Sequence, residues 1–373
     1  MGEFIRNKQD ASMTYRAEID GLRCLAVIPV ILFHMGFTWI EGGYVGVDVF
    51  FVISGFLIST IILREVENES FTFKGFWARR VRRILPALIV MLTATLAMVS
   101  LYSFRGDSSR FAIQGAAAVL SFSNIALWKN TGSYWGTNAQ NSPFLHTWSL
   151  SVEEQFYLIY PVFIFVLLRF ARRALVPVMF SVTLFSFILY LFGSHYKPSA
   201  TFYLLPTRIW ELGCGCLLAI WQVQEQNANA LTSYTRRHSE ALATAGLAAI
   251  IASYFVFSED FWFPGHLAIP VLGTSLFIGF ANGSTGAGRL LSLSPLVHIG
   301  KMSYSLYLWH WPVIVLVPVC FRSTRWVERT DCMLLLMTTL AYLSYRFVET
   351  PTRHASLGSK RFLVCAALVI VRG

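Results

Sequence analysis

The chain has 373 residues, of which 55% are hydrophobic and 13% charged, and its mean hydropathy is +0.56. Soluble domains carry about 25% charged residues, so this composition excludes an ordinary soluble protein and indicates lipid as the solvent. The formal net charge is +10. In a membrane protein such an excess marks cytoplasmic loops, where Lys and Arg collect, and the long apolar runs leave little surface for binding nucleic acid.

Apolar runs long enough to form membrane helices recur along the whole chain. A helix that spans a bilayer needs roughly 17–25 mainly apolar residues. The sequence predicts such helices near residues 22–40, 44–63, 84–102, 110–128, 147–168, 174–193, 203–221, 241–257, 266–282, 303–321 and 331–349. A last apolar run begins at Phe362 and reaches only Gly373, so we expect the sequence to end inside a further helix. No cleavable signal peptide is evident at the start.

Basic segments set the expected orientation. Residues 64–83 hold six Lys and Arg residues, and further Arg residues follow the 147–168 and 203–221 runs, so these loops and the N-terminus are expected in the cytoplasm. The 84–102 helix then leaves the cytoplasm and the 147–168 helix returns to it, so residues 110–128 cannot form a full crossing. This segment is the least hydrophobic candidate, and we predict a re-entrant or protein-buried helix there.

The expected fold class is therefore all-α. We predict a polytopic bundle of membrane helices with about ten full crossings, one re-entrant or buried helix and a truncated C-terminal helix. The expected organisation is a cytoplasmic segment over residues 1–18, a transmembrane domain over 19–355 and the start of a further helix over 356–373. The six cysteines lie in or beside apolar segments without metal-ligand spacing, and no metal site is expected.

A histidine and an aspartate stand at matched depth on the first two helices. His34 lies about five residues from the outer end of its helix, and Asp48 about four residues inside the outer start of the next, so both lie roughly 6–8 Å below the outer edge. A carboxylate that fixes the tautomer of a histidine makes a general base. We predict that His34 is the catalytic base and that Asp48 orients it. A purely structural hydrogen-bonded pair is the alternative.

Other ionisable residues inside spans are functional candidates because charges are rare there. Glu153 and Glu154 are neighbours on a helix, about 100° apart, so at least one is expected to turn inward. Glu153 is a third catalytic candidate, and Tyr157 in the same run is a candidate substrate contact. Arg208 and Glu211, three residues apart, can pair on one helix face and are candidates for binding substrate. A structural ion pair is their competing role.

Arginines gather at the cytoplasmic side of the predicted bundle. Arg23 stands at the base of the first helix, and the others precede the third helix, namely Arg79, Arg80, Arg82 and Arg83. Topology alone explains a couple of these charges, and planar guanidinium forks suit phosphate oxygens. A cytosolic ligand with several phosphates, such as a coenzyme A thioester, would fit, whereas lipid headgroups are the alternative. His310, placed deep in the inner half of its helix, is a candidate lining residue of this donor site or a buried histidine among aromatics.

Several of these runs together carry a family resemblance. They occur in order along the chain: Ile19 to Arg23 with ten residues before His34, Gly46 to Phe56, Arg79 to Pro86, Thr147 to Tyr157, Ser303 to His310, and Glu349 with Pro351 and Arg353. Over roughly residues 15–355 the sequence resembles the membrane acyltransferases of type three. These enzymes O-acylate bacterial surface glycans, peptidoglycan, lipopolysaccharide O-antigen and some small molecules.

The resemblance implies a cytosolic acyl-CoA donor, usually acetyl-CoA, and an acceptor hydroxyl at the outer face of a bacterial inner membrane. It implies a glycan acceptor such as O-antigen, possibly lipid-linked, membrane lipids as surroundings and no nucleic-acid partner. It also implies that Arg23, His34 and the arginine cluster are needed for activity. Some relatives carry a C-terminal SGNH hydrolase-like domain joined through an extra helix, and we expect that helix to begin where this sequence ends.

Two other classes of protein fit part of the pattern. Buried His and Arg residues also suit a transporter of a small anion or a lipid-linked glycan, although we find no two-fold internal repeat of the kind many transporters show. A structural or sensory membrane protein would tolerate alanine at His34, Asp48 and Arg23. For an acyltransferase, His34 either deprotonates the acceptor hydroxyl or takes the acyl group itself.

Overall fold

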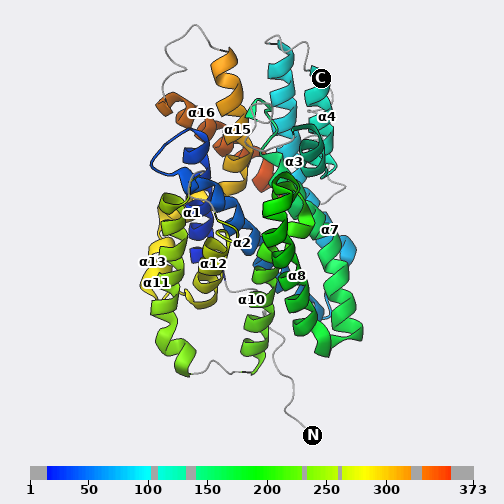
Figure 1. Ribbon diagram of the computed structural model, residues 1–373, viewed down its shortest axis with the longest axis vertical. Helices are drawn as coiled ribbons and strands as arrows, with labels where there is room; N and C mark the ends of the chain where they lie inside the picture. The colour runs from blue at the N-terminus through cyan, green and yellow to red at the C-terminus, as the bar shows by residue number, and fades with distance from the viewer. Residues whose placement is uncertain are drawn as a thin grey trace.

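The computed structural model describes residues 15–101, 108–131, 140–228, 233–258, 263–320 and 330–353, and the regular elements of these residues are helical (Figure 1). The long helices are α1 (Ala17–His34), α2 (Gly46–Glu67), α3 (Phe73–Leu101), α7 (Thr147–Phe170), α8 (Leu175–Tyr196), α10 (Ile209–Ala228), α11 (Ser233–Val256), α12 (Ala268–Phe280), α15 (Ser303–Cys320) and α16 (Thr330–Ser344). Each corresponds to a predicted apolar run, with ends that shift by several residues.

Short elements connect the long helices. They are the 3₁₀ turns η1 (Glu41–Val45), η2 (Arg172–Ala174) and η3 (Leu205–Thr207), the short helices α4 (Ser108–Val119), α5 (Ser123–Thr131), α9 (Pro198–Tyr203), α13 (Gly286–Leu291), α14 (Ser294–Lys301) and α17 (Thr350–Arg353), and the π-helical turn η4 (Tyr345–Glu349). The predicted terminal segment 356–373 lies outside the described residues.

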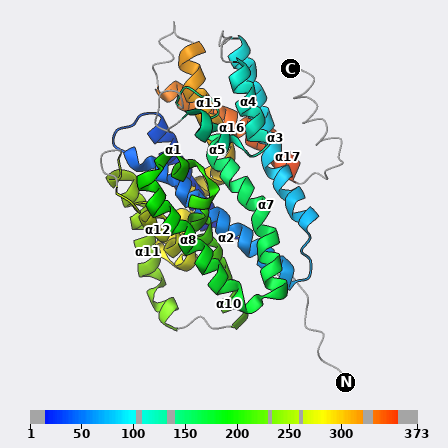
Figure 2. The ribbon, with the colours of Figure 1, turned by 45° about the vertical axis from the view of Figure 1, so that its right-hand side comes forward.

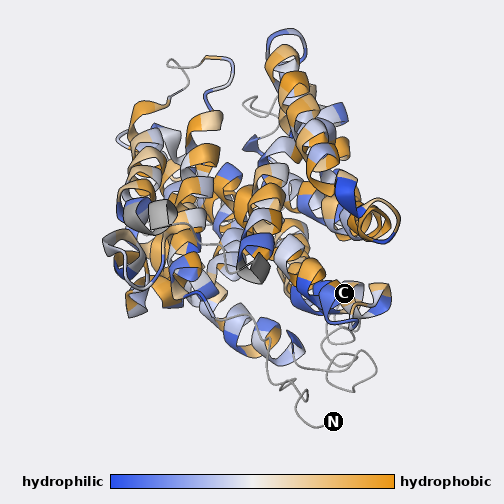
Figure 3. Cartoon of the chain, turned by 90° about the horizontal axis from the view of Figure 1, so that it is seen from below, coloured by the Kyte–Doolittle hydropathy of each residue, from blue (hydrophilic) through white to orange (hydrophobic). Residues whose placement is uncertain are grey.

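Several helices have the length and composition of membrane spans. In the part of the chain that the structure describes, five segments qualify, namely Glu41–Glu67, Phe73–Leu101, Thr147–Phe170, Arg172–Tyr196 and His238–Val256, and α12 is a shorter apolar helix. Large apolar side chains are exposed along α7 and α8, among them Leu158, Phe170, Phe185 and Phe192, and Figure 3 shows hydrophobic residues along most helices. Exposed apolar surface of this extent is rare in soluble monomers. The chain is therefore an integral membrane protein with several apolar helices.

Glycines allow the central helices to approach closely. A Cβ atom added to Gly55 of α2 would lie 2.0 Å from the Leu212 carbonyl oxygen of α10, and one added to Gly215 of α10 would lie 2.1 Å from that of Val52. Similarly, Gly21 of α1 abuts the end of α13, and Gly300 of α14 abuts α1. Such small-residue contacts are typical of helix packing in membranes. They fix the start of α15 beside the base of α1.

Replacing Gly21 by alanine tests the α1–α13 contact. The new methyl group would stand 1.8 Å from the Leu291 carbonyl oxygen, so backbone must move. We expect Gly21→Ala to lower stability by about 1–3 kcal/mol, measured as thermal unfolding of the purified protein in detergent. Gly283→Ala is the matched control, because nothing lies within 4 Å of its Cβ position. Equal melting temperatures for both variants would contradict the packing described here.

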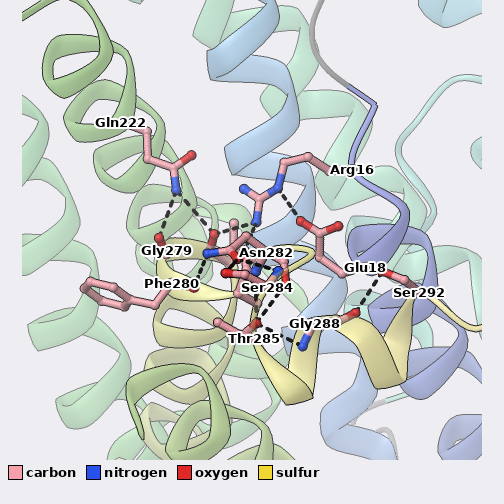
Figure 4. A network of polar contacts seen from close by, with 12 residues as sticks. Arg16, Glu18, Gln222, Gly279, Phe280, Asn282, Ser284, Thr285, Gly288 and Ser292 are labelled. Atoms are coloured by element: carbon pink, nitrogen blue, oxygen red, sulfur yellow. Dashed lines mark hydrogen bonds and ion pairs between the residues drawn. The ribbon is translucent and has the colours of Figure 1, made fainter. Parts of the chain in front are cut away.

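Side chains from other elements cap the C-terminal end of α12 (Figure 4). The Arg16 guanidinium donates to the carbonyl oxygens of Ile278 at 2.9 Å and Ala281 at 3.0 Å, and it pairs with Glu18 at 2.7 Å. Gln222 of α10 donates to the Ile278 carbonyl at 3.2 Å. The last turn of a helix leaves carbonyl groups without intrahelical partners, and burying them unpaired is costly. Arg16 and Gln222 therefore tie α1, α10 and α12 together at this end.

The third helix begins earlier than hydropathy indicates. The predicted span starts at residue 84, whereas α3 starts at Phe73, so the arginine cluster lies on the helix itself. Arginine is a good helix former, and Phe76 on this first part of α3 is fully buried. The Trp77 indole also donates to the Tyr157 carbonyl of α7 at 3.1 Å. Because the arginines lie on a helix and not in a loop, the helical period decides where each of them points.

The segment predicted as one helix at 110–128 consists of two. Helix α4 ends at Val119, Ser121 adopts a positive φ of 62°, and α5 begins at Ser123. At about 1.5 Å per residue, neither α4 nor α5 is long enough to cross a bilayer alone. Ser123 of α5 bonds to Ser151 and to the Thr147 carbonyl of α7, both at 2.7 Å, and Figure 2 shows α5 beside the start of α7.

Candidate active site

A cavity of about 90 Å³ lies between α1, α2, α3, α7 and α15. Its walls combine apolar side chains such as Phe50 and Ile84 with polar ones, chiefly Arg23, Ser54, Arg80, Arg83, Glu153, Tyr157, Tyr304 and Tyr307. The predicted site residues Arg23, Arg80, Arg83, Glu153 and Tyr157 thus meet in one place. They come from three helices, α1, α3 and α7, which are far apart in sequence and which only the tertiary packing brings together.

Helical periodicity divides the predicted arginine cluster into two pairs. Arg80 and Arg83 are three residues apart, so they share a face of α3 and both line the cavity with Arg23. Arg79 turns to Glu65 of α2 and forms an ion pair at 2.6 Å, with 40% of its side chain exposed. The Arg82 Nε donates to the Ala78 carbonyl at 3.1 Å within α3. Arg79 and Arg82 are not among the residues that line the cavity.

A further arginine, not among the predicted site residues, stands near Arg80 and Arg83. Arg353 of α17 lies close enough to Arg80 and Arg83 to repel them electrostatically. Glu349 in the π-helical turn pairs with Arg353 and accepts from Ser305 of α15 at 2.9 Å. Within the described residues, Nε of Arg80 and Nε of Arg353 are buried without a hydrogen-bond partner. Clustered arginines with unused donors suit a polyanionic ligand.

The two neighbouring glutamates of α7 point in different directions, as their spacing predicts. Glu153 accepts from the Ser54 hydroxyl of α2 at 2.8 Å and from the Tyr157 hydroxyl at 3.1 Å, at the wall of the cavity. Glu154 accepts from Ser121, between α4 and α5. The prediction that at least one carboxylate turns inward is confirmed, and Glu153 is the one that does so.

Three histidine rings gather beside the cavity. His34, at the end of α1, lies with Nδ1 3.1 Å from Nε2 of His310 on α15, and their ring centroids are 5.2 Å apart. His146, directly before α7, has its ring centroid 5.5 Å from that of His310. His310 is fully buried and His146 is 1% exposed. Neither ring nitrogen of His146 has a hydrogen-bond partner among the described residues.

Tyr307 joins the cavity to these histidines. It lines the cavity, and its ring centroid lies 5.2 Å from that of His310 and 5.7 Å from that of His146. Its hydroxyl donates to the His146 carbonyl at 3.0 Å and contacts the Ser149 hydroxyl at 2.6 Å. One turn earlier, the Tyr304 hydroxyl donates to the Ile84 carbonyl at 2.7 Å, next to Arg83. One face of α15 therefore leads from the arginines to the histidines.

His146 and Tyr307 were not predicted as site residues, and His310 lies elsewhere than predicted. His310 was expected deep in the inner half of its helix, but it lies against His34. The reason is that α13 and α14 pack on α1 and fix where α15 begins. Tyr307 is three residues from His310, and His146 directly precedes the Thr147-to-Tyr157 run. A place inside one of these runs, or directly before one, is the local signal that could have pointed to them.

The expected pairing of His34 with Asp48 is replaced by a different arrangement. Asp48 accepts from the Arg208 guanidinium at 3.0 Å, and Arg208 also pairs with Glu211 at 2.8 Å. All three side chains are buried, and Arg208 also stacks on the Phe202 ring at 5.1 Å. The predicted Arg208–Glu211 pair therefore exists, extended by Asp48, and it does not line the cavity.

Helical spacing on α2 and its packing on α10 explain this arrangement. Asp48 shares one helical face of α2 with Val52 and Gly55, at spacings of four and three residues. Val52 and Gly55 are the residues that contact Gly215 and Leu212 of α10. Asp48 therefore faces α10, where Arg208 and Glu211 stand, and not the end of α1.

Another buried histidine, His266, lies in the loop before α12 and bonds to Tyr44. The His266 ring donates from Nδ1 to the Phe263 carbonyl at 2.9 Å, and Nε2 then accepts from the Tyr44 hydroxyl at 3.0 Å. The carbonyl oxygen only accepts, so it fixes this direction of bonding for a neutral ring. The contact ties the turn before α2 to the loop before α12.

The fold and site together define an integral membrane protein of apolar helices, with an arginine-lined cavity that leads to a histidine cluster. Within the described residues, no group of His, Cys, Asp and Glu is arranged to hold a metal ion. Residues 16–346 match the acyltransferase domain of the acyltransferase type 3 family. The chain belongs to this family.

Two curated relatives show how far the similarity extends. The chain is 35% identical over 367 residues to the peptidoglycan O-acetyltransferase OatA of Listeria monocytogenes, covering 92% of this chain and 56% of that protein. It is 33% identical over 375 residues to the O-acetyltransferase OatA of Staphylococcus aureus, covering 97% of this chain and 61% of that protein. The chain thus spans little more than half the length of these relatives. No significant match was found among solved structures.

Proposed function

We propose that the chain is a membrane O-acetyltransferase that moves an acetyl group from cytosolic acetyl-CoA to a hydroxyl of a cell-wall glycan across the membrane. The observation that carries this proposal is the continuous path from Arg23, Arg80 and Arg83 to Tyr307, beside His34 and His310. Arginine forks suit the coenzyme phosphates at one end of this path. The histidines at the other end supply a base for acyl transfer.

The acceptor that the relatives favour is peptidoglycan, because the Listeria relative bears that substrate in its name. The names of the two relatives compared above do not mention O-antigen, the acceptor given as an example from the sequence. We therefore place a cell-wall glycan hydroxyl first, with the O-antigen as the alternative.

The chemical step is ordinary acyl transfer. The acceptor oxygen attacks the thioester carbonyl carbon, a C–O bond forms and the C–S bond breaks. The hydroxyl proton passes to His34 and from there to the departing coenzyme A thiolate, so the products are the acetyl ester and free coenzyme A. If His34 carries the acetyl group itself, the same balance is reached in two transfers, and coenzyme A release without acceptor reveals it as a burst. Glu153 and Tyr157, held together at the cavity wall, border the path of the acyl arm.

The proposed topology places the arginines inside and the histidine cluster toward the outside, with about ten full crossings and a cytoplasmic N-terminus. The end of α10 and the start of α11, both expected in the cytoplasm, lie at the bottom of Figure 1. The ends of α3 and α15, both expected outside, lie at its top. The short helices α4 and α5 then form the segment that does not cross.

The direct test uses the purified protein in lipid nanodiscs. We expect acetyl-CoA to be consumed, with release of free coenzyme A thiol and appearance of acetyl ester on added muropeptides. Mass spectrometry of glycans from cells with and without the gene identifies the acceptor. Movement of an anion or glycan across the membrane without thioester cleavage would establish a transporter instead.

The arginine pairs give a sharp prediction for donor binding. Arg83→Ala removes a charge from the cavity, so we expect acetyl-CoA binding to weaken by about 1.5–3 kcal/mol, measured by calorimetry. Arg79→Ala is the matched control on the same helix, because Arg79 is paired with Glu65 away from the cavity. Equal losses in both variants would show that the net charge of the cytoplasmic side, and not the cavity, holds the donor.

A further inference from the structure

The contact between His34 and His310 involves one specific nitrogen of each ring. Nδ1 of His34 lies 3.1 Å from Nε2 of His310. The other nitrogen of His310, Nδ1, lies 2.6 Å from the Tyr307 carbonyl oxygen, one turn back on the same helix. A hydrogen bond needs one donor and one acceptor, and a carbonyl oxygen only accepts. His310 therefore donates its Nδ1 proton to Tyr307.

This first bond determines the second. A neutral imidazole carries one ring proton, so Nε2 of His310 is left with a lone pair and accepts. The proton in the His34–His310 bond then belongs to Nδ1 of His34. We infer that His310 is a positioning residue that holds His34 in the tautomer protonated on Nδ1, with Nε2 as its basic nitrogen. This role replaces the donor-site role predicted for His310, and its consequence for turnover rests on the proposed acetyl transfer.

The surroundings of His310 make it a rigid positioning group. His310 is fully buried, so exchange with bulk water does not compete for its ring nitrogens. Tyr307, whose carbonyl sets the direction of bonding, is anchored through its hydroxyl to the His146 carbonyl and to Ser149. The Trp311 indole donates to the Ser142 carbonyl at 2.7 Å, and its ring lies 4.8 Å from that of His34. The face of α15 that holds His34 is thus tied to the segment before α7.

Two substitutions at position 310 separate the hydrogen bond to His34 from the space that the side chain fills. Glutamine places its side-chain oxygen near the former Nε2, so His310→Gln still offers an acceptor to Nδ1 of His34. Asparagine is shorter and reaches only the former Nδ1 position, so His310→Asn cannot. In a serine protease, loss of the residue that fixes the tautomer of the catalytic histidine lowers turnover by about 10⁴-fold. We expect His310→Asn to lower turnover by about 10²–10⁴-fold with the acetyl-CoA KM nearly unchanged, and His310→Gln to recover much of that loss.

The tautomer itself is measured on the full chain in nanodiscs with ¹⁵N-labelled histidine. The eight histidines give separate ring signals, assigned by single substitutions. We expect His34 protonated on Nδ1 in the wild type, a change of its signal in His310→Asn and its return in His310→Gln. A His34 protonated on Nε2, a doubly protonated His310, or an unchanged His34 signal in His310→Asn would overturn the inference.

The two readouts keep this inference distinct from the proposed function. If the wild type transfers acetyl groups and His310→Asn does so at the same rate, the positioning role is wrong while the function stands. If the wild type cleaves no thioester but the expected tautomer signals are found, the function is wrong and the positioning of His34 by His310 stands.

Discussion

His34→Ala is expected to abolish acetyl transfer while leaving the donor site intact. His34 lies beyond the Tyr307 end of the cavity and is the ring whose basic nitrogen the proposed mechanism uses. Removing a catalytic base costs about 10²–10⁴-fold in rate, and more when the group also carries the acyl group. Arg23, Arg80 and Arg83, which line the cavity, are untouched, so acetyl-CoA affinity is expected to stay within about threefold.

Turnover, acetyl-CoA affinity by calorimetry and melting temperature are measured on one purified preparation of each variant. His195→Ala is the matched control, because His195 is an exposed residue at the end of α8, on a helix that does not line the cavity. We expect the control to behave as the wild type in all three measurements. Full turnover in His34→Ala would remove this histidine from the mechanism. A loss of activity that only parallels a loss of melting temperature would leave His34 a structural role.

Hydropathy predicts most of this fold, because lipid demands about 20 apolar residues per crossing and the sequence shows these runs directly. It fails where polar residues continue a helix, as in the first part of α3, and where a turn interrupts a run, as at Ser121. The arginines lower the hydropathy of the first part of α3, so this part of the helix is not predicted. At Ser121, a single residue with a positive φ separates α4 from α5. Both places pack against α7, and hydropathy contains no information on such contacts.

The site was predictable where helical period applies and not where tertiary packing decides. The inward turn of Glu153 and the Arg208–Glu211 pair follow from spacing on one helix. The contact of His34 with His310 depends on where α13 and α14 seat α15 against α1. Asp48 shares a helical face with Val52 and Gly55, and the packing of that face on α10 decides its partner. Depth in the membrane does not show which way a side chain faces.

The largest expected effect on stability comes from removing Arg208 from the buried group that it forms with Asp48 and Glu211. Arg208 is 4% exposed and is the shared partner of both carboxylates, at 3.0 and 2.8 Å. Arg208→Ala leaves two carboxylates in an apolar interior, and breaking a buried ion pair in this way costs about 3–5 kcal/mol. We expect a large fall in melting temperature in detergent, followed by intrinsic tryptophan fluorescence.

Two further variants show whether charge is the cause. Arg79→Ala breaks a half-exposed ion pair with Glu65, and pairs of that kind contribute about 0–1 kcal/mol, so its melting temperature is expected to change little. Adding Asp48→Asn to Arg208→Ala removes one of the uncompensated charges, and the double variant is expected to be more stable than Arg208→Ala alone. If instead Arg208→Ala melts as the wild type does but loses turnover, the group is not a structural ion network, and Arg208 and Glu211 return to the substrate-binding role that their position on the helix first indicated.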